Sequence, residues 1–346
     1  MTVRRSTAWR LGGLAAVIAL AAGGCSAAAG SAGAGGAGGT HRLTMTQAEA
    51  VYESYVSAND SAAASGNAAQ GLTKVAYAQW AVVKSQFLAL TGAGTPVPRY
   101  RYGQPAFDVP SQTGSREWFV VTVPRQEVLG SQLSATTSTL MLFERPKPSL
   151  PWTVIGTATL DQGLPGLARD RDGYAVAVAD NDASVVLRPN ALGATQAAVV
   201  DEGPANPAAA VVGDGPLTTG LYGSQAAQAS SDQAQGLQYQ WLLEGSDYPQ
   251  FELKTADGGA LVIYAMALNV TTQHANTSSG KPASGSPISV PTAFVPLLGA
   301  TNEVGYHEVI TDWTFEYVAV DPPATAHGAK VDVIGSGGGP TYGHAY

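Results

Sequence analysis

Apolar residues recur at helical spacing in two stretches near the start of the chain. Within residues 44–58 they fall three and four positions apart, which predicts a first helix that Thr44 or Thr46 can cap. Glu49, three residues after Thr46, would complete a capping box. Residues 72–90 (LTKVAYAQWAVVKSQFLAL) predict a second amphipathic helix, which the following glycines and prolines end.

From residue 100 onward the apolar period changes to two, which predicts strands. The predicted strands are 100–108, 118–123, 139–143 and 152–160. Clusters of Pro, Ser and Gly separate them, and such short connections predict an antiparallel sheet. Residues 174–179 and 185–187 are either further strands or a connector.

A second half begins near Pro189, and residues 190–200 predict a short helix with Asn190 as its cap. Residues 203–236 are so rich in Gly, Ala, Pro and Ser that no element is assigned there. The remaining predictions are a hairpin of 251–254 with 260–271, a long strand region at 304–321, a last strand at 330–334 and a loose Gly-rich tail at 336–346.

Both halves place helices before strands, and their closing strands look alike, WTVIG at 152–156 and VDVIG at 331–335. This order predicts an α+β fold. We expect two tandem units, 41–180 and 181–335, each with helices followed by a bent, cone-like antiparallel sheet.

The first 25 residues predict export and a lipid anchor. A positive segment, residues 1–10, precedes a 12-residue apolar segment, 11–22, which is too short to span a membrane. Ala22-Gly23-Gly24-Cys25 then matches a bacterial lipobox. We therefore expect a signal peptide at 1–24, a diacylglycerol lipid with palmitate-type chains on Cys25, and a flexible Gly/Ala/Ser tether over 25–40. The alternative is ordinary secretion with Cys25 as a free thiol.

The charge of the chain bears on its partners. The net charge is −8, and removal of the three signal-peptide arginines leaves 18 − 3 = 15 basic residues against 26 acidic ones, near −11. A chain this acidic binds nucleic acid and anionic lipid poorly, because like charges repel. We therefore expect no nucleic-acid partner, and a covalent lipid as the link to the outer face of the cell membrane. Since Cys25 is the only Cys, the folded part has no disulfide.

Several segments together resemble an uncharacterised family of actinobacterial lipoproteins. They are the lipobox, the tether, the helical start LTMTQAEAVYESYV and the strands EWFVVTV, WTVIGTATL and VGYHEVITDWTFEYVAVD. The resemblance covers most of residues 41–335. It implies units similar to the cystatin-like or nuclear transport factor 2-like folds, in which a bent sheet wraps around helices. It implies no known activity, so no catalytic residue is carried over.

No established catalytic or metal motif is present, and we expect no catalytic residue, metal or cofactor. Asp170 to Gly173 looks faintly like a calcium loop but lacks the terminal Glu, and an acidic turn is the simpler interpretation. Ser278 to Lys281 satisfies S-x-x-K, yet Gly280 and a following Pro place it in a loop. His307 and Glu308 are neighbours on a strand and therefore point to opposite faces.

Aromatic residues on predicted strands are the remaining candidates for a ligand site. Trp313, Phe315 and Tyr317 share one strand face, and Tyr264 lies on another strand. They either pack in the core or line a pocket for an apolar ligand.

Three functions follow from these features. The first is a non-catalytic envelope module that binds an envelope protein or a wall component. The second is a carrier or sensor of a small apolar ligand in a cone-shaped pocket. The third is a hydrolase or isomerase, which would need two titratable groups converging at the pocket mouth.

Overall fold

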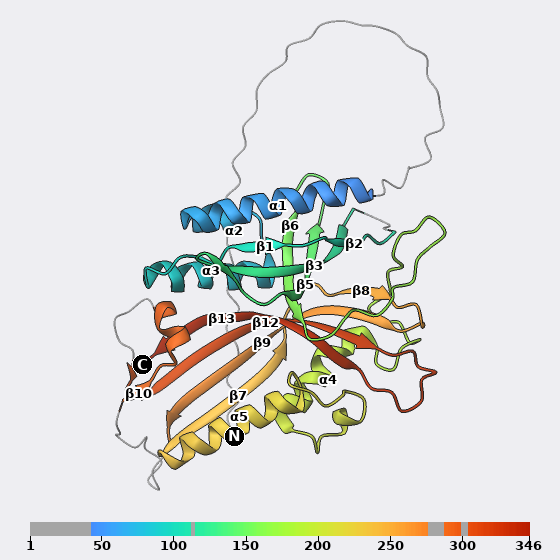
Figure 1. Cartoon of the computed structure of the whole chain (residues 1–346). Coiled ribbons are helices and arrows are strands. Elements are labelled where there is room, and N and C mark those ends of the chain that lie inside the picture. The colour runs from blue at the N-terminus through green and yellow to red at the C-terminus, as the bar shows by residue number, and fades with distance from the viewer. Residues whose placement is uncertain (1–42, 112–114, 276–286, 299–303) are drawn as a thin grey trace, which may run out of the picture. The chain divides into compact units, whose positions relative to one another are not determined.

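The computed structural model in Figure 1 describes residues 43–111, 115–275, 287–298 and 304–346, which belong to the unit Thr40–Tyr346. The predicted signal peptide, Cys25 and the tether lie outside the described residues. The first three helices are α1 (Met45–Ser65), α2 (Ala68–Leu72) and α3 (Tyr77–Gly92).

A capping box begins α1, but its residues are Thr44 and Gln47, and Glu49 takes no part in it. The helix continues past Ala58 because Ala62 and Ala63 are buried, and it ends at Gly66, whose φ of 64° is the left-handed conformation that glycine favours. The second predicted helix, 72–90, corresponds to α3, which begins only at Tyr77, whereas Leu72 is the last residue of the separate short helix α2.

The strands of the first half are β1 (Tyr100–Tyr102), β2 (Ala106–Asp108), β3 (Glu117–Leu129), β4 (Gln132–Leu133), β5 (Thr137–Arg145) and β6 (Thr153–Leu160). Gly103 and Pro105 lie between β1 and β2, so the single strand expected at 100–108 is two short ones. Residues 174–187 form isolated bridges only, which makes this segment the connector.

The helical elements of the second half are α4 (Pro189–Glu202), a 3₁₀ turn η1 (Pro207–Ala210) and α5 (Thr219–Ala234). The expected cap Asn190 is wrong. Arg188 holds the N-cap position without a side-chain bond, and Pro189 starts the helix with its fixed φ. Helix α5 occupies the stretch where the sequence allowed no assignment.

The later strands are β7 (Leu237–Gly245), β8 (Phe251–Lys254), β9 (Ala260–His274), β10 (Ile288–Ser289), β11 (Val304–Gly305), β12 (Glu308–Asp321) and β13 (Asp332–Ala345), with a 3₁₀ turn η2 (Thr292–Leu297) before β11. The predicted hairpin of β8 with β9 is present. The predicted loose tail at 336–346 is wrong, because β13 pairs with β12 as far as Ala345.

One antiparallel sheet contains strands from both halves of the chain. Within the described residues it has 11 strands, in the main order β1-β3-β5-β6-β13-β12-β9-β7. The halves join where β6 meets β13 through only two residue pairs, Leu160 with Gly335 and Thr159 with Ser336. The α+β class is thus observed, and each half does place helices before strands, but the strands of the two halves share one sheet.

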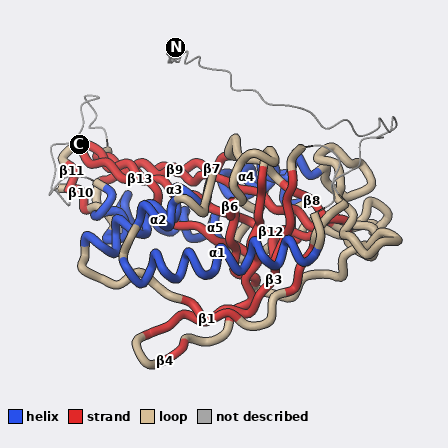
Figure 2. Tube along the Cα trace, turned by 90° about the horizontal axis from the view of Figure 1, so that it is seen from above, coloured by secondary structure: helices blue, strands red, loops and turns tan. Residues whose placement is uncertain are grey.

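The sheet bends at this junction, so each part has an outer face and an inner face (Figures 1 and 2). Helix α1 packs on the outer face of β3 and β5 through Tyr52, Tyr55 and Phe143. The inner faces pack on each other, with the Trp118 and Phe251 ring centroids 4.9 Å apart.

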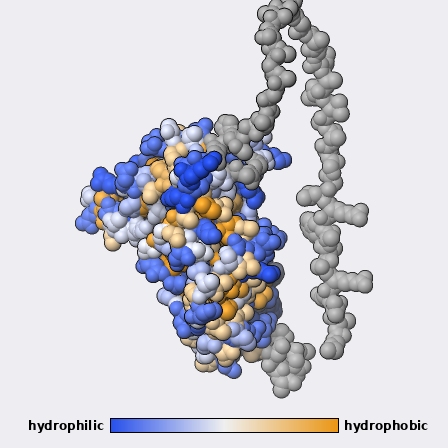
Figure 3. Space-filling model, turned by 90° about the vertical axis from the view of Figure 1, so that its right-hand side faces the viewer, coloured by the Kyte–Doolittle hydropathy of each residue, from blue (hydrophilic) through white to orange (hydrophobic). Residues whose placement is uncertain are grey.

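Helices α4 and α5 cover the outer face of β7, β9 and β12, and Leu192, Val200 and Met266 are among the buried residues packed there. On the face shown in Figure 3, apolar and polar side chains alternate in small areas.

Candidate functional site

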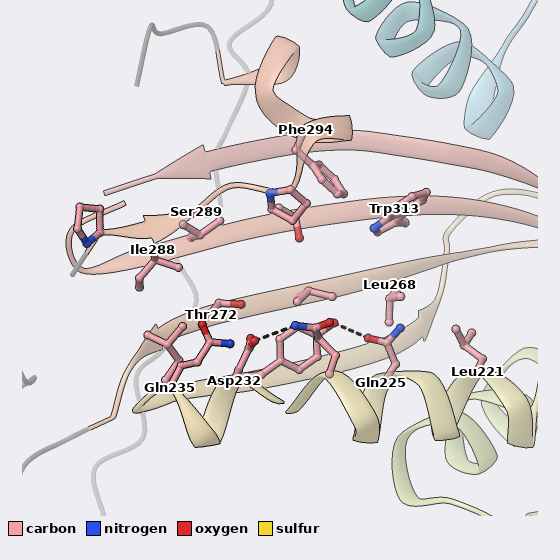
Figure 4. Close-up of a pocket in the computed structure, with 18 of the residues that line it drawn as sticks. Leu221, Gln225, Asp232, Gln235, Leu268, Thr272, Ile288, Ser289, Phe294 and Trp313 are labelled. Atoms are coloured by element: carbon pink, nitrogen blue, oxygen red, sulfur yellow. Dashed lines mark hydrogen bonds between the residues drawn. The ribbon is translucent and has the colours of Figure 1, made fainter. Parts of the chain in front are cut away.

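Helix α5 presents a polar stripe toward the sheet. Gln225, Gln228 and Asp232 of α5 and its C-cap residue Gln235 follow one another at spacings of three, four and three residues, which places them on one side of the helix axis. Asp232 is only 6% exposed. The stripe faces strands β9 and β12 across an open space (Figure 4).

The opposite wall of this space is aromatic and aliphatic. Trp313 and Phe315 lie two positions apart on β12, so both rings point to the α5 side. The two rings stack with centroids 5.9 Å apart and planes 4° apart. Leu268 and Val270 of β9 continue this wall.

The segment of β10 and η2 closes a third side. Phe294 of η2 is 1% exposed and packs edge-on against Trp313, at 5.3 Å between centroids and 81° between planes. Ile288 and Ser289 of β10 line the space beside it. Together these elements line an open cavity of about 580 Å³, which we call the α5 cavity.

Hydrogen bonds hold the polar wall in place. The Tyr239 hydroxyl donates to Oε1 of Gln225 at 2.5 Å, and Nε2 of Gln228 donates to Oδ1 of Asp232 at 2.7 Å. Nε2 of Gln235 donates to the Ser231 carbonyl at 3.2 Å. Burial, with a smaller contribution from the nearby Asp232 charge, raises the pKa of Tyr239 to about 12, so this hydroxyl keeps its proton.

The structure places the four candidate aromatics on the same side of the sheet but not all in the cavity. Trp313 and Phe315 line the cavity, whereas Tyr317 is fully buried behind Phe315, 5.5 Å away between centroids. Tyr264 packs 5.7 Å from Tyr317 and donates to Oε1 of Gln196 in α4 at 2.5 Å. Tyr264 and Tyr317 therefore belong to the core.

Other residues with potential chemistry lie elsewhere. Asp170 accepts from the backbone N–H groups of Asp172 and Tyr174, which is an acidic turn. Within the described ranges no group of three or more His, Cys, Asp or Glu could hold a metal ion. His307 is exposed, and the Ser278 to Lys281 segment lies outside the described residues.

Sequence reasoning missed the polar wall. The spacing of Gln225, Gln228 and Asp232 was a usable signal, but a polar stripe reads equally well as a solvent-facing helix surface. Only the packing of α5 on β7 shows that this stripe faces the sheet.

The fold and the cavity define an α+β protein with a long bent sheet and a half-polar cavity beside α5. The chain belongs to the family described as "Domain of unknown function (DUF8094)", which it matches over residues 40–342.

It is also similar to a protein of Streptomyces avermitilis described as "Uncharacterized lipoprotein", with 29% identity over 162 residues, 46% of this chain and 44% of the relative. The chain thus spans less than half the length of that relative. No solved structure matches the chain. None of the helices in the described part of the chain has both the length and the apolar character needed to cross a membrane.

Proposed function

We propose that this protein is a lipid-anchored binding protein at the outer face of the cell membrane, whose folded unit takes up a small molecule in the α5 cavity. The observation that carries the proposal is the cavity itself, about 580 Å³ with one aromatic and one polar wall. This volume lies within the usual range for small-molecule sites, about 300–1,000 Å³.

The sequence suggested a small apolar ligand, but the composition of the cavity walls favours a ligand of mixed polarity. A purely apolar ligand would offer no hydrogen bond to the Gln225 amide nitrogen or to Oε1 of Gln228 and Gln235, the amide atoms that take no part in the hydrogen bonds of the wall. An amphipathic ligand, with an apolar body against Trp313 and Phe315 and polar groups toward α5, satisfies both walls.

A cavity-filling variant tests the proposal. The test uses the mature chain with Cys25→Ser, with and without Thr272→Trp, which places an indole in the cavity. Thr271→Trp is the matched control, because Thr271 lies on the opposite face of β9.

A thermal-shift screen of small molecules should yield compounds that stabilise the parent and the Thr271→Trp variant but not Thr272→Trp. The proposal fails if no compound distinguishes the two variants.

The anchor is a separate part of the proposal. The lipoprotein relative and the lipobox at Cys25 support it. In cell fractionation, Cys25→Ser should move the protein from the membrane to the medium or leave it uncleaved. A mutant of mature size that stays with the membranes would contradict the lipid link.

Tandem units similar to the cystatin-like or nuclear transport factor 2-like folds remain part of the proposal. Support comes from the shared order of elements, α1 to β6 and then α4 to β13. An experimental structure in which these two halves do not superimpose would refute it.

A further inference from the structure

The formal charge of the α5 cavity lining, over the described residues, is negative. Asp232 is its one acid, and neither Lys, Arg nor His lines the described part of the cavity. A carboxylate or phosphate ligand would therefore meet a negative charge with no cation to pair with it, whereas a cation would be attracted.

The half of the chain that forms the cavity also carries a negative net charge. Residues 189–346 contain 3 basic and 14 acidic residues, a formal net charge of −11, whereas residues 26–188 contain 12 of each. Burial raises the pKa of Glu252, Glu316 and Asp321, and −8 remains if these three are counted as neutral. Such a field raises the local concentration of cations near the cavity.

The polar wall offers hydrogen-bond acceptors. Gln228 and Gln235 use their amide nitrogens in the hydrogen bonds described above, so their Oε1 atoms remain for a ligand, together with Oδ2 of Asp232. The donors on this side are the Gln225 amide and a few hydroxyl groups. An ammonium group, which donates three hydrogen bonds and accepts none, fits this wall.

The aromatic wall suits the same ligand. The Trp313 ring stands across the cavity from the polar stripe (Figure 4). Phe315, which stacks on Trp313, lines the same cavity. Aromatic faces attract cations through their quadrupole and pack well against apolar groups. A molecule with an ammonium head and an apolar body can satisfy both walls in one orientation.

We propose that the ligand of the α5 cavity is an organic cation, an amine or ammonium compound with an apolar body. This inference rests on the proposed binding function and narrows its ligand class. It follows from the juxtaposition of Asp232 and the amide oxygens with Trp313 and Phe315.

Three probes with one carbon frame test it: 4-phenylbutylamine, 4-phenylbutan-1-ol and 4-phenylbutanoate. Binding is measured by titration calorimetry to the mature chain with Cys25→Ser and to its Asp232→Asn variant. Asp214→Asn is the matched control, since Asp214 is exposed and does not line the cavity. Thr272→Trp reports whether binding occurs in the cavity.

The amine should bind at least about tenfold more tightly than the alcohol, which corresponds to about 1.4 kcal/mol, and the carboxylate most weakly. Asp232→Asn should remove most of the difference, whereas Asp214→Asn should preserve it.

Equal affinity for amine and alcohol, lost in Thr272→Trp, would overturn the cation inference and leave the binding function intact. No binding of any probe would count against both. An amine preference that Asp232→Asn leaves unchanged would also overturn the inference.

Discussion

A buried carboxyl group in the middle of the sheet makes the stability of this protein depend on pH. Glu316 of β12 is 3% exposed, and its Oε2 accepts from the backbone N–H of Thr157 in β6 at 2.7 Å. With its amide nitrogen turned toward Glu316, Gln79 of α3 donates at 2.8 Å. In the opposite orientation the Gln79 oxygen can accept from the protonated carboxyl, so both forms of Glu316 have a partner.

Burial dominates the titration of this group. It raises the pKa of Glu316 from 4.5 to about 8, although the Thr157 hydrogen bond works in the opposite direction. Between these two values the folded chain keeps a proton that the unfolded chain has lost, so the free energy of unfolding falls as pH rises. At about 1.36 kcal/mol per pKa unit, the loss between pH 5 and pH 8 is about 3–4 kcal/mol.

Glu316→Gln removes this titration with little change in shape. We expect the variant to lose about 3–4 kcal/mol less stability than the parent between pH 5 and pH 8. Urea unfolding at a series of pH values measures this difference. Glu252 and Asp321, whose pKa values burial also raises to about 7, titrate in both proteins and cancel.

Glu308→Gln, a half-exposed position on the same strand, is the control and should follow the parent. If Glu316→Gln and the parent showed parallel pH profiles, the burial argument would be refuted.

Three further substitutions test local packing and helix capping in the fold. Gly337→Ala should destabilise the protein by more than about 3 kcal/mol in urea unfolding, because a Cβ there would lie 1.7 Å from the Thr157 carbonyl oxygen; an effect below 1 kcal/mol would contradict this geometry. Thr44→Ala removes the capping box of α1 and should cost about 1 kcal/mol, whereas Thr46→Ala should cost less; a larger loss for Thr46→Ala would show that Thr46 is the cap. Phe294→Ala removes a fully buried ring beside the α5 cavity and should lower stability by about 3–5 kcal/mol; an unchanged midpoint would show that η2 does not pack there.

Part of the candidate site was predictable from the sequence. Alternation along β12 was sufficient to place Trp313, Phe315 and Tyr317 on one face, because side-chain direction in a strand has a period of two. Which of them reaches a cavity was not predictable. Tyr317 is covered by α4 and β9 residues that come from more than 40 positions away in the chain, and its burial depends on that packing.

The sequence by itself determined the local elements: the helix after Thr44, the β8–β9 hairpin and the alternating strands. Each of these depends on neighbours only a few residues apart. Only the tertiary structure decided that the two halves share a sheet, that residues 219–234 form a helix facing a cavity, and that the Gly-rich end is a strand.

The strand at the Gly-rich end of the chain shows why the sequence alone was not sufficient. Glycines at 335–339 weaken any local preference for a strand, so composition indicated a loose tail. In the folded chain β12 offers a long pairing edge, and the close approach of Gly337 to Thr157 leaves no space for a side chain. The pairing partner and this steric requirement both come from residues distant in sequence, where local pattern carries no information.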